Sequence, residues 1–181
     1  AVSRRRLESA RSRPKWEEKL AGRPAPARAA ALAPRVKEVF RSEGMPPELI
    51  WLAEVESSFN PEARSPVGAA GLFQFMPATA QRFGLAVQPK DERLVPEKSA
   101  KAAASYLRYL HGMFNSWPLA LAAYNAGEGR VGKALKSAGT RTFEAIEDSL
   151  PVETQMYVPK VLATIKLREK TDPAAMPPPR K

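Results

Sequence analysis

The sequence predicts an all-α domain of many short helices, and three observations lead to this prediction. Apolar residues recur at helical spacing in several stretches, most clearly from Pro96 to Phe114. No stretch shows the apolar–polar alternation that is typical of a half-buried strand. Proline and glycine divide the chain at short intervals, which ends one helix and begins the next. At 181 residues the chain is long enough for one domain with a sizeable core.

The two ends of the chain differ from its middle in composition. Residues 1–33 are rich in arginine, alanine and proline and show weak apolar periodicity, so we expect a flexible basic leader with a helical piece around Lys15–Ala21. Residues 171–181 contain four prolines, and we expect a disordered tail there. The folded domain is therefore expected to span residues 34–170.

Within this domain, prolines that suit a first helical turn and glycines that suit a helix end set the expected boundaries. Pro34 and Pro77 are two such starts, and Gly84 and Gly139 are two such ends. Pro159 is expected to kink or restart the last helix. The expected helices are Arg35–Ser42, Glu48–Ser57, Ala78–Phe83, Pro96–Phe114, Pro118–Asn125, Gly129–Ser137, Thr142–Ser149 and Val152–Glu169.

The net charge of +10 is concentrated at the ends of the chain. Residues 1–34 carry nine Lys or Arg against three Asp or Glu, whereas residues 35–165 carry fifteen against fourteen. Solvated basic tails are one interpretation, and attraction to an anionic polymer or membrane surface is another. Because the middle has no basic stripe and the tails have few aromatic residues, we expect no nucleic-acid binding.

Composition excludes several kinds of chemistry. The absence of cysteine rules out disulfides, thiol catalysis and cysteine-based zinc sites. His111 is the only histidine, which argues against a Ser–His nucleophile and against a multi-histidine metal site; we expect it to be exposed or half-buried and assign it no role.

No apolar run approaches the ~18–20 residues of a transmembrane helix. The N-terminus lacks the apolar core of a signal peptide, which fits a cytosolic protein or an exported one after trimming.

One acid lies on an apolar helix face. At helical spacing, Leu49, Leu52, Ala53 and Glu56 share one stripe, whereas Glu54 points to the opposite side. Glu56 is therefore expected to be partly desolvated, which favours its protonated form and makes it a candidate general acid. Glu54 is expected to see more water. On its own the pattern leaves two alternatives open, because a lone glutamate on a helix is more often structural or exposed.

Four segments taken together give a more specific indication. They are ESSFNP (56–61), GAAGLFQ (68–74), AAYNAG (122–127) and ETQMYV (153–158). Their order and spacing closely resemble the lytic transglycosylases of the soluble-lytic-transglycosylase type, and the nearest subgroup resembles membrane-bound lytic murein transglycosylase D. The resemblance covers about residues 34–166. It implies a compact lysozyme-like fold of the goose type, with short helices around a substrate cleft.

The resemblance also implies roles for residues of the first two segments. Glu56 corresponds to the single catalytic acid and base, and Ser57 to a serine that orients that acid or the sugar. Gly71 corresponds to a glycine that lets the backbone approach the substrate, and Gln74 to a substrate contact. Ser57 as a helix terminator and Gln74 as a satisfied loop side chain remain alternatives. Phe73 replaces the methionine common at its position, which alters the expected local contact shape.

The remaining two segments supply three more expected substrate-binding residues. Tyr124 and Asn125 correspond to residues that line the cleft near the scissile bond. Tyr157 corresponds to a tyrosine that packs or hydrogen-bonds near the catalytic acid. Each has a structural alternative: Tyr124 in the core, Asn125 at a helix end, and Tyr157 in plain packing.

The activity implied by the resemblance is cleavage of peptidoglycan between N-acetylmuramic acid and N-acetylglucosamine, without water and with no metal or cofactor. The implied partner is the glycan strand. From the charge of the tails we also expect binding to anionic envelope polymers. The implied setting is the periplasm or cell envelope, and we expect a monomer. A hydrolytic muramidase and a catalytically silent wall-binding scaffold remain the alternatives.

Overall fold

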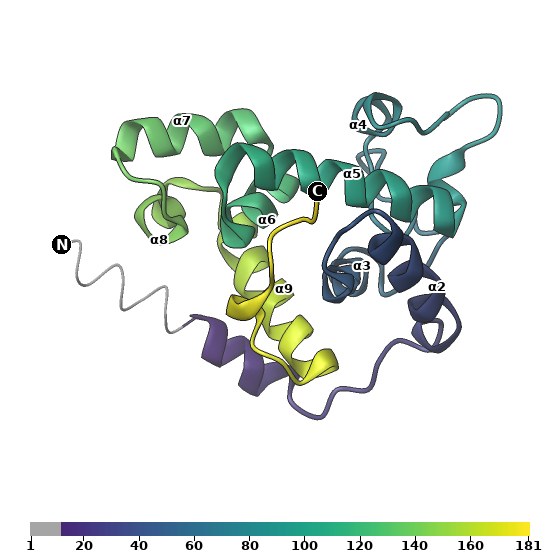
Figure 1. Ribbon diagram of the computed structural model, residues 1–181, viewed down its shortest axis with the longest axis horizontal. Helices are drawn as coiled ribbons and strands as arrows, with labels where there is room; N and C mark the ends of the chain where they lie inside the picture. The colour runs from purple at the N-terminus through teal and green to yellow at the C-terminus, as the bar shows by residue number, and fades with distance from the viewer. Residues whose placement is uncertain (1–11) are drawn as a thin grey trace. The chain divides into compact units, whose positions relative to one another are not determined.

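The computed structural model describes residues 12–181 and is all-α over that range (Figure 1). These residues form isolated β-bridges but no strand, which confirms the expected fold class. Residues 1–11 of the expected leader lie outside the described range. The α-helices are 12–20, α2 (Ala29–Ser42), α3 (Leu52–Ser57), α4 (Pro77–Arg82), α5 (Pro96–Phe114), α6 (Trp117–Ala126), α7 (Glu128–Ala138), α8 (Phe143–Ile146) and α9 (Val152–Glu169). The 3₁₀ turns are η1 (Pro47–Trp51), η2 (Glu92–Leu94), η3 (Glu147–Ser149) and η4 (Pro173–Ala175).

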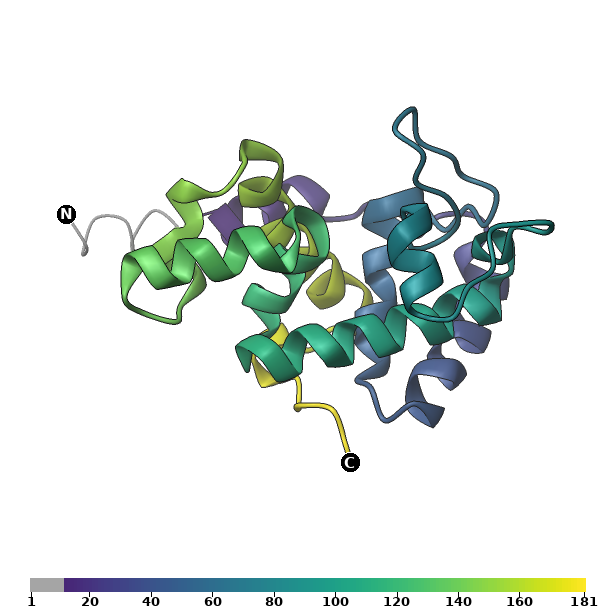
Figure 2. The ribbon, with the colours of Figure 1, turned by 90° about the horizontal axis from the view of Figure 1, so that it is seen from above.

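The chain divides into two compact units. The described part of unit 1 is residues 12–22 and Tyr109–Ala175, and unit 2 is Arg23–Arg108 with Met176–Lys181. The division falls within α5, which is one uninterrupted helix (Figure 2). None of the helices in residues 12–181 combines the length and the apolar character needed to cross a bilayer.

The core of unit 2 forms where α2 packs against η1. α2 presents buried residues at helical spacing, including Val36 and Phe40, neither of which is exposed to solvent. The ring of Phe40 stacks on that of Phe73, with centroids 5.8 Å apart. The Phe73 side chain therefore fills the core of unit 2.

Helix α2 begins at Ala29, six residues before the expected start at Arg35. Pro34, expected in the first turn, lies inside the helix. Because proline has no backbone N–H, the helix lacks one internal hydrogen bond at this position. Burial of Ala29, Leu32 and Ala33 in the added turn compensates for that loss.

The Pro-rich C-terminal segment, expected to be disordered, makes defined contacts. Met176 is buried, and the backbone N–H of Arg180 donates to the carbonyl of Gly44 at 2.9 Å. The Arg108 guanidinium donates to the carbonyl of Arg180 at 2.9 Å. The helix at residues 12–20 overlaps the helical piece expected around Lys15–Ala21. The division into leader, domain 34–170 and tail stays a prediction.

In unit 1, α6 packs against both α7 and α9. α6 buries most of its residues, because its small alanines permit close approach of neighbouring helices. α9 continues through Pro159 without the expected restart. The bounds of α5 and α9 agree with the sequence prediction.

His111 is buried, contrary to expectation, with its ring centroid 4.3 Å from that of Trp117. Burial penalises the charged imidazolium and lowers the pKa of His111 from its ordinary value of 6.5. Helical phase within α5 did not reveal this burial, because the covering ring comes from the next helix.

We expect His111→Phe to weaken the pH dependence of stability between about pH 7.5 and 5.5. As the pH falls below 6.5, the unfolded chain takes up a proton that folded His111 resists. The unfolded state therefore binds more protons, and the wild-type free energy of unfolding falls. Urea denaturation at both pH values measures the effect in wild type and variant. An identical pH dependence in the two proteins would contradict the assignment.

Candidate active site

Glu56 lies in the last turn of α3, on the stripe that the sequence predicts. Leu49, Leu52 and Ala53 on this stripe have no solvent exposure, and Glu56 itself is half-buried. Glu54 is also half-buried, so the expectation that it sees more water than Glu56 is not supported. Burial therefore does not separate the two acids.

Ser57 ties the end of α3 to the Gly-rich loop (68–75). Its hydroxyl is 2.8 Å from the carbonyl oxygen of Leu72 and 3.0 Å from that of Ala53. One hydroxyl proton serves both acceptors, as a hydroxyl has only one donor hydrogen. Ser57, which follows Glu56 directly, is thus bonded to the middle of the loop.

Gly71 occupies a position that no other residue can take without a shift of the backbone. Its φ is +84°, and a Cβ placed on it would lie 1.9 Å from the carbonyl oxygen of Arg93. Its N–H donates to the carbonyl of Ala63 at 2.8 Å. The loop and the η2 turn therefore meet at Gly71, backbone against backbone.

Gln74 is bonded within the loop. Its Nε2 donates to the carbonyl of Gly71 at 2.8 Å and to that of Ala63 at 3.2 Å. Its φ of +51° lies in the left-handed region, as do those of Ser58 and Phe59 after α3. Such conformations cost energy in non-glycine residues and are concentrated at functional sites. The two bonds from Nε2 orient the side chain.

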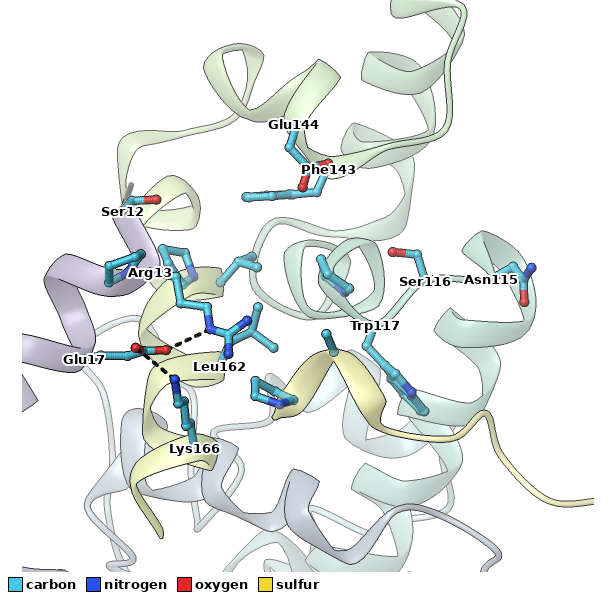
Figure 3. A pocket seen from close by; sticks show the side chains of 16 residues that line it. Ser12, Arg13, Glu17, Asn115, Ser116, Trp117, Phe143, Glu144, Leu162 and Lys166 are labelled. Carbon is cyan, nitrogen blue, oxygen red and sulfur yellow. Dashed lines mark hydrogen bonds and ion pairs between the residues drawn. The ribbon is translucent and has the colours of Figure 1, made fainter. Parts of the chain in front are cut away.

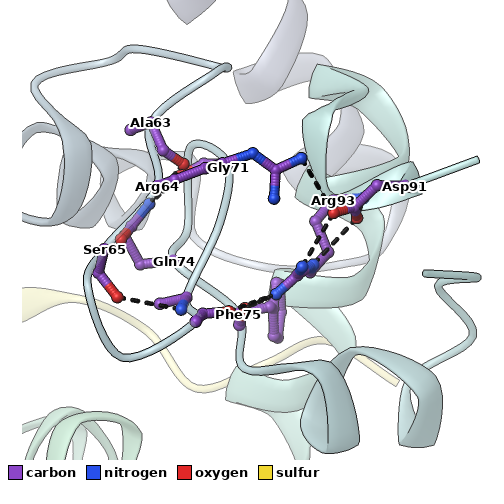
Figure 4. A network of polar contacts seen from close by, with 10 residues as sticks. Ala63, Arg64, Ser65, Gly71, Gln74, Phe75, Asp91 and Arg93 are labelled. Carbon is purple, nitrogen blue, oxygen red and sulfur yellow. Dashed lines mark hydrogen bonds and ion pairs between the residues drawn. The ribbon is translucent and has the colours of Figure 1, made fainter.

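Sequence reasoning missed an ion pair between a buried arginine and a half-buried aspartate beside this loop (Figure 4). Arg93 is 4% exposed and binds both oxygens of Asp91, with Nε to Oδ1 at 2.9 Å and Nη2 to Oδ2 at 2.8 Å. Hydrogen bonding from Arg93 holds the pKa of Asp91 below its ordinary value, although burial opposes the shift. No sequence pattern assigned a role to Asp91 or Arg93. The remaining Arg93 bonds reach residues 18 and 25 positions away, which no local pattern indicates.

The three other predicted residues lie in unit 1. Asn125 lies in the last turn of α6, where its Oδ1 accepts a hydrogen bond from the buried Thr154 hydroxyl at 2.8 Å. Its Nδ2 donates to Glu153 Oε1 at 3.4 Å. Tyr157 is buried on α9, and Tyr124 is half-buried on α6. Thr154 is a supporting residue that the motif contains but that we did not single out.

A separate cavity of about 700 Å³ opens within unit 1, between the helix at residues 12–20 and α9 (Figure 3). Its walls include Trp117, and at its rim Glu17 pairs with Arg13 at 3.0 Å and with Lys166 at 3.3 Å. None of the predicted site residues lines this cavity. The candidate active site is therefore distinct from it.

Comparison with solved structures defines the class of the fold. The X-ray structure of an inactive mutant of the lytic transglycosylase Slt from Pseudomonas aeruginosa matches 84% of this chain and 26% of that one, with a TM-score of 0.67 and 30% sequence identity. The expected lysozyme-like, transglycosylase-type fold is therefore confirmed.

The chain belongs to the transglycosylase SLT domain family, whose profile matches residues 37–146. It is 42% identical over 127 residues to membrane-bound lytic murein transglycosylase D of Escherichia coli, covering 68% of this chain and 28% of the relative. It is 41% identical over 137 residues to the soluble lytic murein transglycosylase of Salmonella typhimurium, covering 71% and 20%. The chain thus spans less than a third of the length of each of these two relatives.

Proposed function

We propose that this chain is a peptidoglycan lytic transglycosylase. It cleaves the β-1,4 bond between N-acetylmuramic acid and N-acetylglucosamine and leaves a 1,6-anhydromuramic end. Its membership of the SLT family and the murein transglycosylase names of its relatives support the proposal. The observation that carries it is the placement of Glu56 at the end of an apolar helix face, one residue before the serine that bonds to the Gly-rich loop.

In the proposed reaction Glu56 acts first as an acid and then as a base. Its carboxyl proton passes to the glycosidic oxygen as the bond to C1 of the muramic sugar breaks. The carbonyl oxygen of the muramic N-acetyl group stabilises the cationic C1. Ionised Glu56 then takes the proton from the C6 hydroxyl, whose oxygen bonds to C1. Glu56 ends protonated, as it began, and no water is consumed.

A single acid suffices for this chemistry, whereas retaining and inverting glycosidases use two carboxylates that flank the scissile bond. Glu54 is two residues from Glu56, which puts it on the opposite side of a helix turn. Glu62 is exposed in the loop that follows α3. The internal C6 hydroxyl replaces the water that a second carboxylate would activate.

We infer that the other site residues bind or position the glycan. Ser57 positions Glu56 through its bond to the loop. Gly71 lets the backbone of the loop lie directly against the backbone of Arg93, which keeps the loop in place. Gln74 offers its side-chain carbonyl to the sugar. Tyr124, Asn125 and Tyr157 are proposed substrate-binding residues, supported by their correspondence to the family pattern.

Product analysis tests the proposal directly. Mass spectrometry of digested peptidoglycan should find muramic ends that are lighter than hydrated ends by one water molecule. Hydrated ends alone would assign the chain to the hydrolytic muramidases. No cleavage at all would favour a wall-binding scaffold.

We further propose that the enzyme acts as a monomer in the periplasm or cell envelope and that its basic N-terminal residues raise its affinity for anionic wall polymers. Replacing Arg4, Arg5 and Arg6 by glutamine should then weaken binding to isolated sacculi several-fold at low salt. The difference should vanish at high salt, because ions screen exposed charges beyond about 10 Å at 0.1 M. Co-sedimentation over a salt series measures this.

The matched control removes the same charge from exposed lysines elsewhere on the chain. These are Lys90, Lys101 and Lys136. If both triple variants lose the same affinity, net charge explains the binding and the N-terminal residues have no special role.

A further inference from the structure

The Asp91–Arg93 pair holds the Gly-rich loop at both of its ends. Besides binding Asp91, Arg93 Nη1 donates to the carbonyl of Gly68 at 2.8 Å and to that of Phe75 at 2.7 Å. The Arg93 guanidinium points from the η2 segment to the loop in Figure 4, with Asp91 beside it. One buried guanidinium thus fixes the first and the last residue of the loop.

The loop needs such a support because its conformation is unfavourable by itself. Gln74, next to the anchored Phe75, has a φ of +51°, which L-amino acids seldom adopt. The backbone N–H of Ala70 donates to the carbonyl of Phe75 at 3.1 Å, and the N–H of Phe75 donates to the carbonyl of Ala70 at 3.2 Å. No regular strand extends this pairing. Without the guanidinium, the carbonyls of Gly68 and Phe75 would also lose the charged donor they share.

The loop is connected in turn to the proposed catalytic acid. The Ser57 hydroxyl bonds the carbonyl of Leu72, in the middle of the loop, at 2.8 Å. Ser57 follows Glu56 directly in α3. A contiguous set of contacts therefore runs from Asp91 through Arg93 and the loop to Ser57 and Glu56.

We propose that Arg93, oriented by Asp91, is a positioning residue of the cleavage reaction, which holds Gln74 and the α3 terminus in the arrangement that acts on the glycan. This inference rests on the proposed function. Arginine is required because its planar guanidinium binds a carboxylate with two nitrogens and two carbonyls with a third. A lysine ammonium is a point charge and cannot reproduce this geometry.

The test compares turnover per folded molecule in Arg93→Lys and Arg93→Ala with that of wild type, on soluble glycan strands released from sacculi. We expect kcat to fall about tenfold in Arg93→Lys and about a hundredfold in Arg93→Ala, because small misplacements of reacting groups carry losses of that order. KM should change by less, since most glycan contacts are elsewhere. Circular dichroism and thermal unfolding give the folded fraction of each variant.

Chemical rescue separates positioning from plain stability. Guanidinium ion, added well below denaturing concentrations, should raise the kcat of Arg93→Ala at least fivefold, because it occupies the vacated site beside Asp91. Urea has nearly the same shape but no charge, and it should restore nothing. Arg64→Ala is the matched control, because Arg64 contacts the same carboxylate at 3.5 Å from a side chain that is 57% exposed. It should keep kcat within about twofold of wild type.

Wild-type turnover per folded molecule in both Arg93 variants would overturn the proposal, as would equal rescue by urea and guanidinium. The proposed function fails separately, if wild type gives hydrated ends. The Arg93 variants can still be compared in that case, on the hydrolytic rate. If wild type cleaves no glycan, both proposals fall, since there is then no reaction for Arg93 to support.

Discussion

Glu56→Gln is expected to lower the rate of glycan cleavage about a thousandfold or more while leaving the fold intact. Positioned acid–base groups contribute about 10²–10⁴-fold, and here one carboxyl group serves both proton transfers. Glutamine has almost the same shape but can neither give a proton to the glycosidic oxygen nor take one from the C6 hydroxyl. An inactive form of the related Slt transglycosylase is a glutamate-to-glutamine mutant, which is consistent with this expectation.

Glu54→Gln is the matched control for Glu56→Gln. The same substitution falls in the same helix, at a residue that is also half-buried. It should keep most of the activity, because no step of the proposed reaction uses Glu54. Rates from release of soluble muropeptides, with thermal unfolding of each variant, measure both effects. Near-normal turnover in Glu56→Gln would end the assignment of the acid, and equal losses in both variants would leave Glu56 without a special role.

Local sequence signals predicted most of the helices, because proline, glycine and apolar spacing act within one element. α5 and α9 begin and end where these signals place them. The first turn of α2 escaped prediction because tertiary burial of Leu32 outweighs the local effect of Pro34. The C-terminal segment escaped it for a similar reason, since the bond from Arg180 to Gly44 joins residues far apart in the chain.

The candidate site likewise contains residues that the sequence could indicate and one that it could not. Its acid and its Gly-rich turn follow from patterns of a few residues, so Glu56 and Gly71 could be proposed from the sequence. Arg93 could not, because its buried bonds depend on how the loop folds back onto η2. No periodic pattern in the sequence marks a supporting residue such as Arg93. Its role is seen only from the folded arrangement of the loop.

Gly71→Ala is expected to destabilise the protein by about 3 kcal/mol or more and to lower activity along with stability. A left-handed backbone alone costs an L-residue about 1–2 kcal/mol. The added methyl group would also lie 1.9 Å from the carbonyl oxygen of Arg93, so the loop and η2 must move apart. That movement pulls Arg93 away from the carbonyls of Gly68 and Phe75, and the loss of buried, charged hydrogen bonds adds to the cost.

Gly84→Ala isolates the contribution of the close contact from that of the backbone angle. Gly84 has nearly the same φ, +88°, but a methyl group there meets no atom within 4 Å. Only the cost of the left-handed conformation remains, about 1–2 kcal/mol. Urea denaturation of the two variants gives the difference, which should exceed about 1 kcal/mol. Equal losses would mean that the loop absorbs the methyl group freely. The loop would then not be fixed against η2, and Arg93 would have nothing rigid to hold in place.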